Sequence, residues 1–459
     1  MSGTEVVQEH KCAGCGEQMQ FDPETRGLIC RGCGSQAQAE EETNTLQTDG
    51  LTCPNCGADL TVTPGARQAN CEFCGSTFSV LKEDENCEVV GDIPEDHILV
   101  VPFGTSREDY QKGMISWLAG EKGTPVDAFE QIGMIHAAEG CYIPHYLCVA
   151  SYQVNWSASI GYDRIETYVT HMRVTQNGRT VTKPVTRTRV VTDWRPFSST
   201  ACGRVTNECP ATNFLHNTYK NVTEANTKEN LFGIKDSSNG RFNKMSIPLD
   251  PATARPLNTE PFDTKYTAGF KVIACDFPAT KSYDKNYVNQ QIRRAIERSA
   301  PGDRIRDLRF NGTIIPDYSL VYVPTWLTVY SYKNKICANH ADGVRVGAQF
   351  GTRPIDKDQK RFARRIMIPF LVSAALLIIT VAIGMFSEGR AMPDMFNTIQ
   401  DVFIGLTIFT GLGGVITRAV VFRKSKGQLM QQLDANLQNP SRIFGRKSSK
   451  DDPIKELIK

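Results

Sequence analysis

Four Cys-x-x-Cys-Gly motifs in the first 75 residues constrain the fold of this chain more than any other feature. The motifs form two pairs, and every cysteine of the first pair recurs 41 residues later in the second, which indicates an internal duplication. Within each pair, fourteen residues separate the two motifs, which is long enough for a short β-hairpin. The eight cysteines are Cys12, Cys15, Cys30, Cys33, Cys53, Cys56, Cys71 and Cys74.

Four thiolates at this spacing can bind a tetrahedral Zn²⁺ ion at metal–sulfur distances of about 2.3 Å. The sequence therefore predicts two structural zinc ribbons, at 10–36 and 51–80, with polar linkers at 37–50 and 81–96 that let the ribbons move independently of the body. The glycine after each second cysteine permits a tight turn. Because all four ligand positions are cysteine, no coordination site stays open for water or substrate. Redox-active dithiols and a cross-braced pairing of the motifs are the alternatives.

Charge is divided unevenly between the ribbons and the rest of the chain. The first 90 residues carry five Lys and Arg against fifteen Asp and Glu, so their net charge is −10 in a chain of +2. Affinity for nucleic acid depends on Lys and Arg contacts to phosphate, which disfavours such a partner. The first thirty residues also lack the apolar core of a secretory signal, which favours reduced cysteines in the cytosol. We expect the ribbons to bind a soluble cytoplasmic protein.

Two long apolar runs lie towards the other end of the chain. Residues 366–386 contain no charged side chain and would form a helix of about 32 Å, enough to cross the hydrocarbon core of a bilayer. Residues 402–422 are the weaker candidate because they contain four glycines and Arg418. Both runs are predicted to be transmembrane helices, and a buried core helix is the alternative for each.

Basic residues flank the two runs, whereas the short loop between the runs is acidic, so the positive-inside rule places both termini in the cytoplasm. The flanking residues are Arg361, Arg364 and Arg365 before the first run, and Arg418, Arg423, Lys424 and Lys426 at and after the end of the second. The tail, residues 423–459, is expected to bind anionic lipid and to contain a short amphipathic surface helix at Leu429, Leu433 and Leu437. The glycines of the second run would support close helix packing or a homo-oligomer.

The region between the ribbons and the membrane, residues 97–355, also contains a duplication. "YIPHYLCVASY" at 142–152 matches "YVPTWLTVYSY" at 322–332, with an offset of 180. An apolar strand and then a helix with apolar residues at period 3.6 precede each copy. We therefore expect an α+β body in which two strand–helix–strand repeats are related by a pseudo-twofold axis.

A β-rich insert follows the first repeat. Residues 164–174 and 179–191 are rich in Thr, Val and Arg, and the "QNG" between them is a strong hairpin signal at Asn177 and Gly178. The pattern predicts an extended ribbon with one solvated, basic face. Lipid headgroups or an acidic partner are alternative neighbours for that face.

Motifs of known catalytic sites are missing from the sequence. It contains no Walker-type phosphate loop, no Gly-x-Ser-x-Gly elbow and no His-Glu-x-x-His motif. No catalytic residue is therefore assigned, and the chain is expected to act without catalysis. An enzyme whose site lies between the two body repeats stays an alternative.

These features together resemble a bacterial family of membrane-anchored proteins with zinc ribbons of the transcription factor IIB type, also described as primosomal-protein-N′-like. The resemblance rests on the cysteine motifs of the second ribbon, on "VVPF" at 100–103, "GCYIPHYL" at 140–147 and "VYVPTWLTVYSYKNK" at 321–335, and on the apolar runs. The additional first ribbon departs from the family, as does "ANHADGVRVG" in place of an Asn-Gly-x-Thr-Gly turn. Some members are encoded beside phage-shock-protein-A-like and flotillin-like proteins. The resemblance therefore implies an anchor for membrane-remodelling or envelope-stress proteins.

The sequence as a whole predicts an integral membrane adaptor. Two zinc ribbons would bind a soluble partner, the duplicated body would form a platform, and a two-helix hairpin would anchor both in the bilayer. A membrane-tethered nucleic-acid binder is the first alternative and an enzyme is the second.

Overall fold

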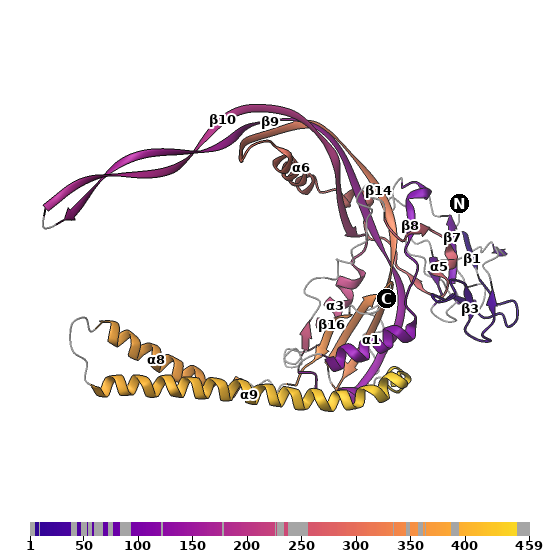
Figure 1. The fold of residues 1–459 in the computed structure, drawn as a ribbon. Coiled ribbons are helices and arrows are strands. Elements are labelled where there is room, and N and C mark those ends of the chain that lie inside the picture. The colour runs from indigo at the N-terminus through magenta and orange to yellow at the C-terminus, as the bar shows by residue number, and fades with distance from the viewer. Residues whose placement is uncertain are drawn as a thin grey trace.

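The protein has an α+β fold, as the sequence predicts (Figure 1). Long curved strands form the centre, the two ribbon sheets lie beside them, and two projections leave the body towards the same side, one made of strands and one of helices (Figure 1). The computed structural model describes residues 5–8, 10–37, 44–46, 53, 57–58, 68–71, 77–82, 93–120, 123–176, 179–224, 226, 234–236, 256–333, 335–345, 349–356, 361–362, 364–386 and 394–447.

Three long antiparallel strands form the framework of the body. They are β9 (Ile132–Gln176), β10 (Arg179–Pro210) and β14 (Arg304–Tyr332). The sheet continues in the order β10-β9-β14-β15-β16-β11 through β15 (Lys335–Asp342), β16 (Gln349–Pro354) and β11 (Ile234–Asp236). Aromatic and β-branched residues favour this extended conformation. The two matched segments of the sequence lie in the first half of β9 and at the end of β14.

β9 and β14 pair antiparallel about one pair of equivalent residues from the two repeats. Ile143 is opposite Val323, and the offset of 180 makes these residues equivalent. The short first strands, β8 (Ile98–Val100) and β13 (Lys271–Val272), each pair in parallel with the long strand of the other repeat. This exchange of partners is the arrangement that a pseudo-twofold axis through the Ile143–Val323 pair requires.

One helix of each repeat packs on the sheet. α1 (Arg107–Gly120) belongs to the main core, and α6 (Lys285–Ser299) packs on a second core that contains Tyr152 and Trp156 of β9. The buried residues of the two helices are Tyr110, Met114, Ile115, Leu118 and Ala119 in α1, and Val288, Ile292 and Ile296 in α6. The shorter elements are α2 (Ala128–Gln131), α3 (Phe214–Glu224), α5 (Thr264–Thr267), β12 (Glu260–Pro261) and two 3₁₀ turns, η1 (Glu95–His97) and η3 (Ala279–Ser282).

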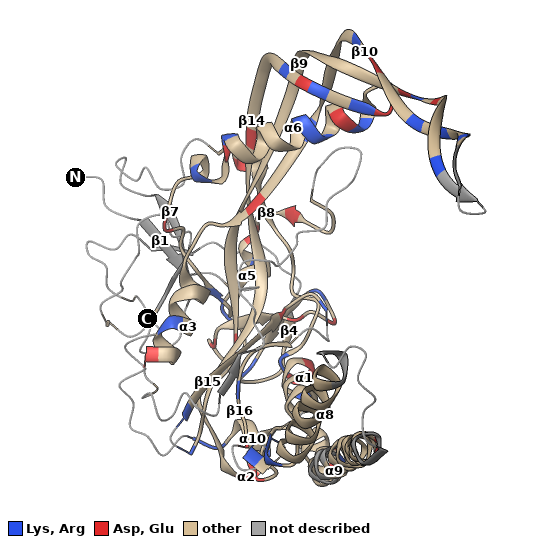
Figure 2. Ribbon diagram, turned by 90° about the vertical axis from the view of Figure 1, so that its left-hand side faces the viewer, with Lys and Arg blue, Asp and Glu red and all other residues tan. Residues whose placement is uncertain are grey.

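The outer parts of β9 and β10 extend beyond the rest of the sheet as a two-stranded ribbon (Figures 1 and 2). Pairing of β14 with β9 begins at Gly161, so residues 162–192, here called the arm, lie beyond the end of the third strand. Gln176 of β9 is opposite Arg179 of β10, which is the register of a two-residue hairpin loop. The extended ribbon predicted by the sequence is therefore present, although its two turn residues lie outside the described part of the chain.

The amino-terminal residues form two small sheets. The first ribbon contains β2 (Met19–Phe21), β3 (Leu28–Cys30) and β4 (Gln36–Ala37). The second sheet has the order β5-β1-β7-β6 and contains β1 (Glu5–Gln8), β5 (Asn44–Leu46), β6 (Gln68–Asn70) and β7 (Thr77–Lys82). β5 thus lies within the stretch predicted as a linker at 37–50, and most of the linker predicted at 81–96 lies outside the described residues. β1 pairs with β7 and so satisfies the backbone hydrogen-bonding groups along one edge of that strand.

Two helices form the second projection (Figure 1). α8 (Ile368–Phe386) packs against α9 (Asp394–Gln438), which is one continuous helix of 45 residues. α9 includes both the run at 402–422 and the first part of the tail. Leu429 and Leu433 are buried in the main core, and α10 (Ser441–Phe444) follows there. The separate surface helix predicted in the tail is therefore wrong, because burial of these leucines holds the end of α9 against the body.

Candidate metal centre and membrane segment

Four cysteine sulfurs converge in the first ribbon. The Sγ atoms of Cys12, Cys15, Cys30 and Cys33 all lie within 4.8 Å of one another. Cys12 Sγ is 3.5 Å from Cys33 Sγ, and Cys15 Sγ is 3.4 Å from Cys30 Sγ. Sulfurs bound to one tetrahedral Zn²⁺ would be about 3.8 Å apart, so this cluster has the size of a zinc site. The four cysteines that converge come from one repeat, which excludes the cross-braced alternative for this ribbon.

A repeated backbone turn holds the first cysteine of each motif in this ribbon. The N–H of Gly16 donates to the carbonyl of Cys12 at 2.8 Å, and the N–H of Cys12 donates to the carbonyl of Glu17 at 2.8 Å. The turn at Cys30 has the same bond from Gly34 at 2.9 Å. Both glycines have positive φ, 73° and 75°, a conformation that side chains disfavour. The prediction that glycine permits these turns is confirmed here.

Electrostatics favours a cation between the four sulfurs. The backbone N–H groups of Cys15 and Gly14 lower the pKa of Cys12 to about 6. The backbone N–H of Glu17 by itself would lower the pKa of Cys15, but the contact with Cys30 and burial outweigh it and raise that pKa to about 12. The cysteines of one cluster therefore differ in how readily they ionise. All four can ionise together only when a positive ion compensates their mutual repulsion.

The second ribbon is described in part. Cys53 and Cys71 are buried, whereas Cys56 and Cys74 lie outside the described residues. The N–H of Gly57 donates to the carbonyl of Cys53 at 2.8 Å, and Gly57 has a φ of 73°. This is the turn seen twice in the first ribbon. The backbone at Cys53 therefore has the turn that holds the candidate metal ligands Cys12 and Cys30 in the first ribbon.

The first ribbon packs against the body and does not move independently as its polar linkers suggest. The ring of Phe21 is buried against Tyr266 with centroids 5.4 Å apart, and the N–H of Phe21 donates to the carbonyl of Ala268 at 3.1 Å. Arg26 Nη2 is 3.3 Å from Glu260 Oε1. Exposing a buried phenylalanine costs about 2 kcal/mol, which favours the docked position. The sequence does not predict this contact, because an apolar residue in a hairpin can equally belong to the core of the ribbon itself.

Among the described residues, one helical stretch is long and apolar enough to cross a membrane. It is Thr398–Thr417 of α9, which has 20 residues and is only 6% buried. The apolar stretch of α8, Ile368–Ile383, is shorter. The sequence favours 366–386 over 402–422, whereas the longest described apolar stretch lies in α9. α8 as a whole has 19 residues, and residues 366 and 367 form a turn before it begins.

Small and polar residues lie where α8 and α9 meet. A Cβ atom on Gly411 would come within 2.9 Å of the Phe370 ring, so only glycine allows this approach. Ser373 Oγ is 3.2 Å from Thr410 Oγ1 across the same contact. Most large apolar side chains of both helices point away from the protein and are exposed. Such a surface is unusual for a helix pair in water and is typical of one in lipid.

The predicted flanking cations lie before α8 and within α9. Arg361, Arg364 and Arg365 precede α8 and are exposed, as is Arg423 of α9. Arg418, Lys424 and Lys426 also lie in α9, beyond Thr398–Thr417, with side chains outside the described set.

No known protein family, curated protein or solved structure matches this chain. The resemblance to membrane-anchored zinc-ribbon proteins therefore stays a prediction.

Proposed function

We propose that this protein is a membrane-anchored scaffold that recruits a soluble protein to the cytoplasmic face of the membrane. One observation carries the proposal: the four-cysteine cluster is docked on a body that the single helix α9 joins directly to an exposed apolar segment. A ribbon held in this way has a defined position relative to the apolar helices. That is what a recruiting platform needs.

In this proposal the metal is structural Zn²⁺. The first ion would be bound by Cys12, Cys15, Cys30 and Cys33, and the second by Cys53, Cys56, Cys71 and Cys74. The compact sulfur cluster supports the first site, and the matching turn at Cys53 supports the second. With every ligand position taken by cysteine, the metal would hold each ribbon in its fold and supply no open site for chemistry.

The membrane part of the proposal has two spans, one in α8 and one in α9, with both termini in the cytoplasm. α8 has 19 residues, which as a helix is about 28 Å and close to the thickness of the hydrocarbon core. The basic residues at Arg364, Arg365 and Arg423 support this orientation through the positive-inside rule. The small residues of α9 would also permit a homo-oligomer.

The recruited partner would be a soluble cytoplasmic protein. The resemblance suggests a phage-shock-protein-A-like or flotillin-like membrane-remodelling protein, and the net charge of −10 on the first 90 residues suggests a partner with a basic surface. The same charge argues against the first alternative, a nucleic-acid binder built on the ribbons.

The second alternative, an enzyme with its site between the two repeats, lacks support from the packing. The centre of the β9–β14 contact is filled by buried aromatic side chains, among them Tyr142, Tyr146, Tyr322 and Trp326. A site in this position would need a polar pocket where titratable groups converge. The described residues at this seam show packed rings instead.

The test is affinity purification from detergent-solubilised membranes, in which the intact chain is compared with a Cys30→Ser, Cys71→Ser variant. We expect a soluble protein to co-purify with the intact chain and to be lost from the variant. Cys202→Ser, which changes an exposed cysteine outside both ribbons, is the matched control and should retain the partner. A partner that binds all three chains equally would contradict a role for the ribbons.

Membrane orientation needs a separate measurement. Membrane-impermeant thiol reagents applied to intact cells should leave the ribbon cysteines unlabelled and should label them after lysis and metal removal. Labelling in intact cells would place the ribbons outside and would overturn the proposal.

A further inference from the structure

The arm has two different faces. Residues directly opposite each other on β9 and β10 share a face, and Ile165 is opposite Val190, while Val169 is opposite Thr186. Six neighbouring residues on one side of the arm carry no charge and are here called the uncharged face: Ile165, Thr167, Val169, Thr186, Thr188 and Val190. Asp163 and Arg173 lie on the same side, before and after this stretch of β9. Ile165 is 74% exposed, and Val169 and Val190 are each 59% exposed. All six residues are β-branched and exposed, and three of them are apolar.

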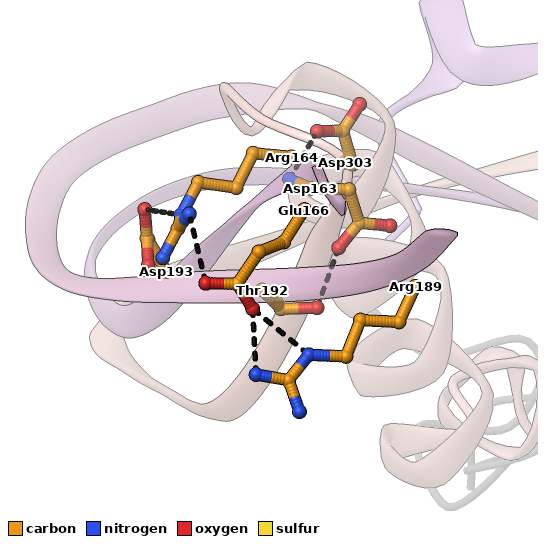
Figure 3. Close-up of polar contacts among 7 residues, drawn as sticks. All are labelled: Asp163, Arg164, Glu166, Arg189, Thr192, Asp193 and Asp303. Carbon is orange, nitrogen blue, oxygen red and sulfur yellow. Dashed lines mark hydrogen bonds and ion pairs between the residues drawn. The ribbon is translucent and has the colours of Figure 1, made fainter. Parts of the chain in front are cut away.

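The other face of the arm is a ladder of ion pairs (Figure 3). Arg164 Nε donates to Asp193 Oδ2 at 3.0 Å, and Arg189 Nε donates to Glu166 Oε2 at 2.8 Å. Each pair joins β9 to β10. These exposed pairs contribute little energy singly, but they hold the charged side chains of this face against one another and away from the uncharged face.

The base of the arm is fixed to the body. Asp163 accepts a hydrogen bond from Arg304 Nε of β14 at 2.9 Å, and the N–H of Asp163 donates to Asp303 Oδ2 at 2.8 Å. Figure 3 shows Asp303 and Thr192 on either side of Asp163 at this point. The arm therefore leaves the body in a defined direction.

The outer part of the arm is strongly basic. Between Thr167 and Arg189 the sequence has five Lys and Arg and no Asp or Glu. Figure 2 shows Lys and Arg positions recurring along the arm towards its end. Lys183 and Arg187 are exposed, and neither makes an ion pair with any described residue. Both side chains lie on the side of the ion pairs, because Lys183 is opposite Met172 and Arg187 is opposite Tyr168. The arm thus carries exposed positive charge on one side and exposed apolar side chains on the other.

Figure 1 shows that the arm and the α8–α9 pair leave the body on the same side. We propose that the arm binds a membrane surface rich in anionic lipid, with the uncharged face against the lipid and the basic side chains among the headgroups. The inference rests on the proposed membrane anchor, because a bilayer around Thr398–Thr417 lies on the side to which the arm projects. Each basic side chain near such a surface adds roughly 1 kcal/mol of attraction, which is about a 5-fold change in occupancy.

The arm would stay at the level of the headgroups and not cross the hydrocarbon core. A two-stranded ribbon has unpaired backbone N–H and C=O groups on both outer edges, which the hydrocarbon core does not tolerate. At the headgroup level water satisfies these edges, while Ile165, Val169 and Val190 can still reach the acyl boundary. The arm would in this way set the tilt of the body relative to the membrane, in addition to the position set by α9.

Nucleic acid is the other polyanion that a basic ribbon could bind. Phosphate binding uses the basic side chains but leaves the exposed Ile165, Val169 and Val190 without a role. A lipid surface uses both features, so the observations favour lipid. The experiment below includes nucleic acid as a distinct outcome.

The test is photo-crosslinking of the full chain in lipid nanodiscs, with p-benzoylphenylalanine in place of Ile165 on the uncharged face. The matched control carries the same residue in place of Tyr168, which is on the opposite face of the same strand. Nanodiscs of phosphatidylcholine alone are compared with nanodiscs that also contain phosphatidylglycerol, and a short DNA duplex is present in each sample. Mass spectrometry then identifies the adducts.

We expect lipid adducts at position 165, several-fold fewer at position 168, and a dependence on phosphatidylglycerol. Lys183→Gln with Arg187→Gln should lower the adduct yield by about 5-fold for each charge removed. Lys112→Gln with Lys220→Gln removes the same charge from α1 and α3 and should leave the yield unchanged. The variants change exposed side chains, so the fold should be retained.

Two results would overturn the inference. One is a chain that inserts into nanodiscs but forms no lipid adduct at position 165, which leaves the membrane anchor intact. The other is DNA or protein adducts at position 165 in place of lipid. A chain that does not insert at all would refute the proposed anchor instead. Repeating the crosslinking with phosphatidylglycerol vesicles would then test the arm separately.

Discussion

Trp326 of the second repeat donates its indole N–H to Thr105 Oγ1, 2.9 Å away, in the loop just before α1 of the first repeat. The hydroxyl of Thr105 in turn donates a hydrogen bond to the carbonyl of Gly343. One short chain of hydrogen bonds therefore joins the two repeats and the turn after β15. The ring of Trp326 also stacks on Tyr110 of α1 with centroids 5.7 Å apart. This residue therefore connects the pseudo-symmetric halves at the main core.

Replacing Trp326 with alanine should destabilise the body by about 3–5 kcal/mol, because it leaves a large cavity in a fully packed region. Denaturant unfolding, followed by circular dichroism in detergent, would measure the loss. Trp194→Ala is the matched control, since Trp194 is only partly buried at the base of the arm. Equal losses in both variants would contradict the role of Trp326 in joining the repeats.

Zinc content provides a second prediction. The intact chain should bind two Zn²⁺ ions, and Cys30→Ser should bind one, because three remaining ligands bind structural zinc much more weakly. Elemental analysis of the purified chain gives the count directly. Cys202→Ser should still bind two ions. A count of zero in the intact chain would refute both sites, and an unchanged count in Cys30→Ser would refute the assigned ligand.

Stability should depend on pH through His340. Burial lowers the pKa of His340 to about 4, whereas the unfolded side chain has the ordinary value of about 6.5. Between these two values the unfolded chain binds more protons, so the free energy of unfolding should fall as the pH drops from about 6.5 to 4. The contribution is up to about 3 kcal/mol and is fully present above pH 6.5.

A pair of variants tests whether burial or the hydrogen bond of His340 causes this pH dependence of stability. The hydroxyl of Tyr219 lies 2.7 Å from His340 Nδ1. His340→Gln should flatten the pH profile of stability over this range. Tyr219→Phe removes the hydroxyl but keeps the imidazole buried, so the steep profile should persist at a lower overall stability. A steep profile in His340→Gln would assign the pH dependence to other groups.

The α8–α9 contact depends on Gly411. Gly411→Leu should push the helices apart, because the new side chain would overlap the Phe370 ring, and overpacking of this kind costs about 1–3 kcal/mol. Thermal unfolding in detergent would report the change. Gly405→Leu is the matched control, since no atom lies within 4 Å of a Cβ at that position. If both leucines are tolerated equally well, the two helices do not pack as described.

Features set by short-range chemistry were predictable from the residues alone. Metal-ligand spacing brings Cys12, Cys15, Cys30 and Cys33 together, and the "QNG" signal predicts the arm and its register. Predominantly apolar composition over about twenty residues predicts the helix at 402–422. Each of these depends on a period or a spacing within a few dozen residues, which a single sequence displays directly.

Contacts between distant segments were decided only by the tertiary structure. Nothing near Phe21 indicates that it packs on Tyr266, and nothing near Leu429 indicates that α9 ends in the main core. The sequence likewise gives no sign that β5 forms in a polar stretch. Nor does it indicate that β8 and β13 pair with the long strand of the other repeat. Such contacts depend on which apolar surfaces and open strand edges meet once the long strands are assembled. A local pattern shows that a surface is apolar, but its partner emerges only when the whole chain packs.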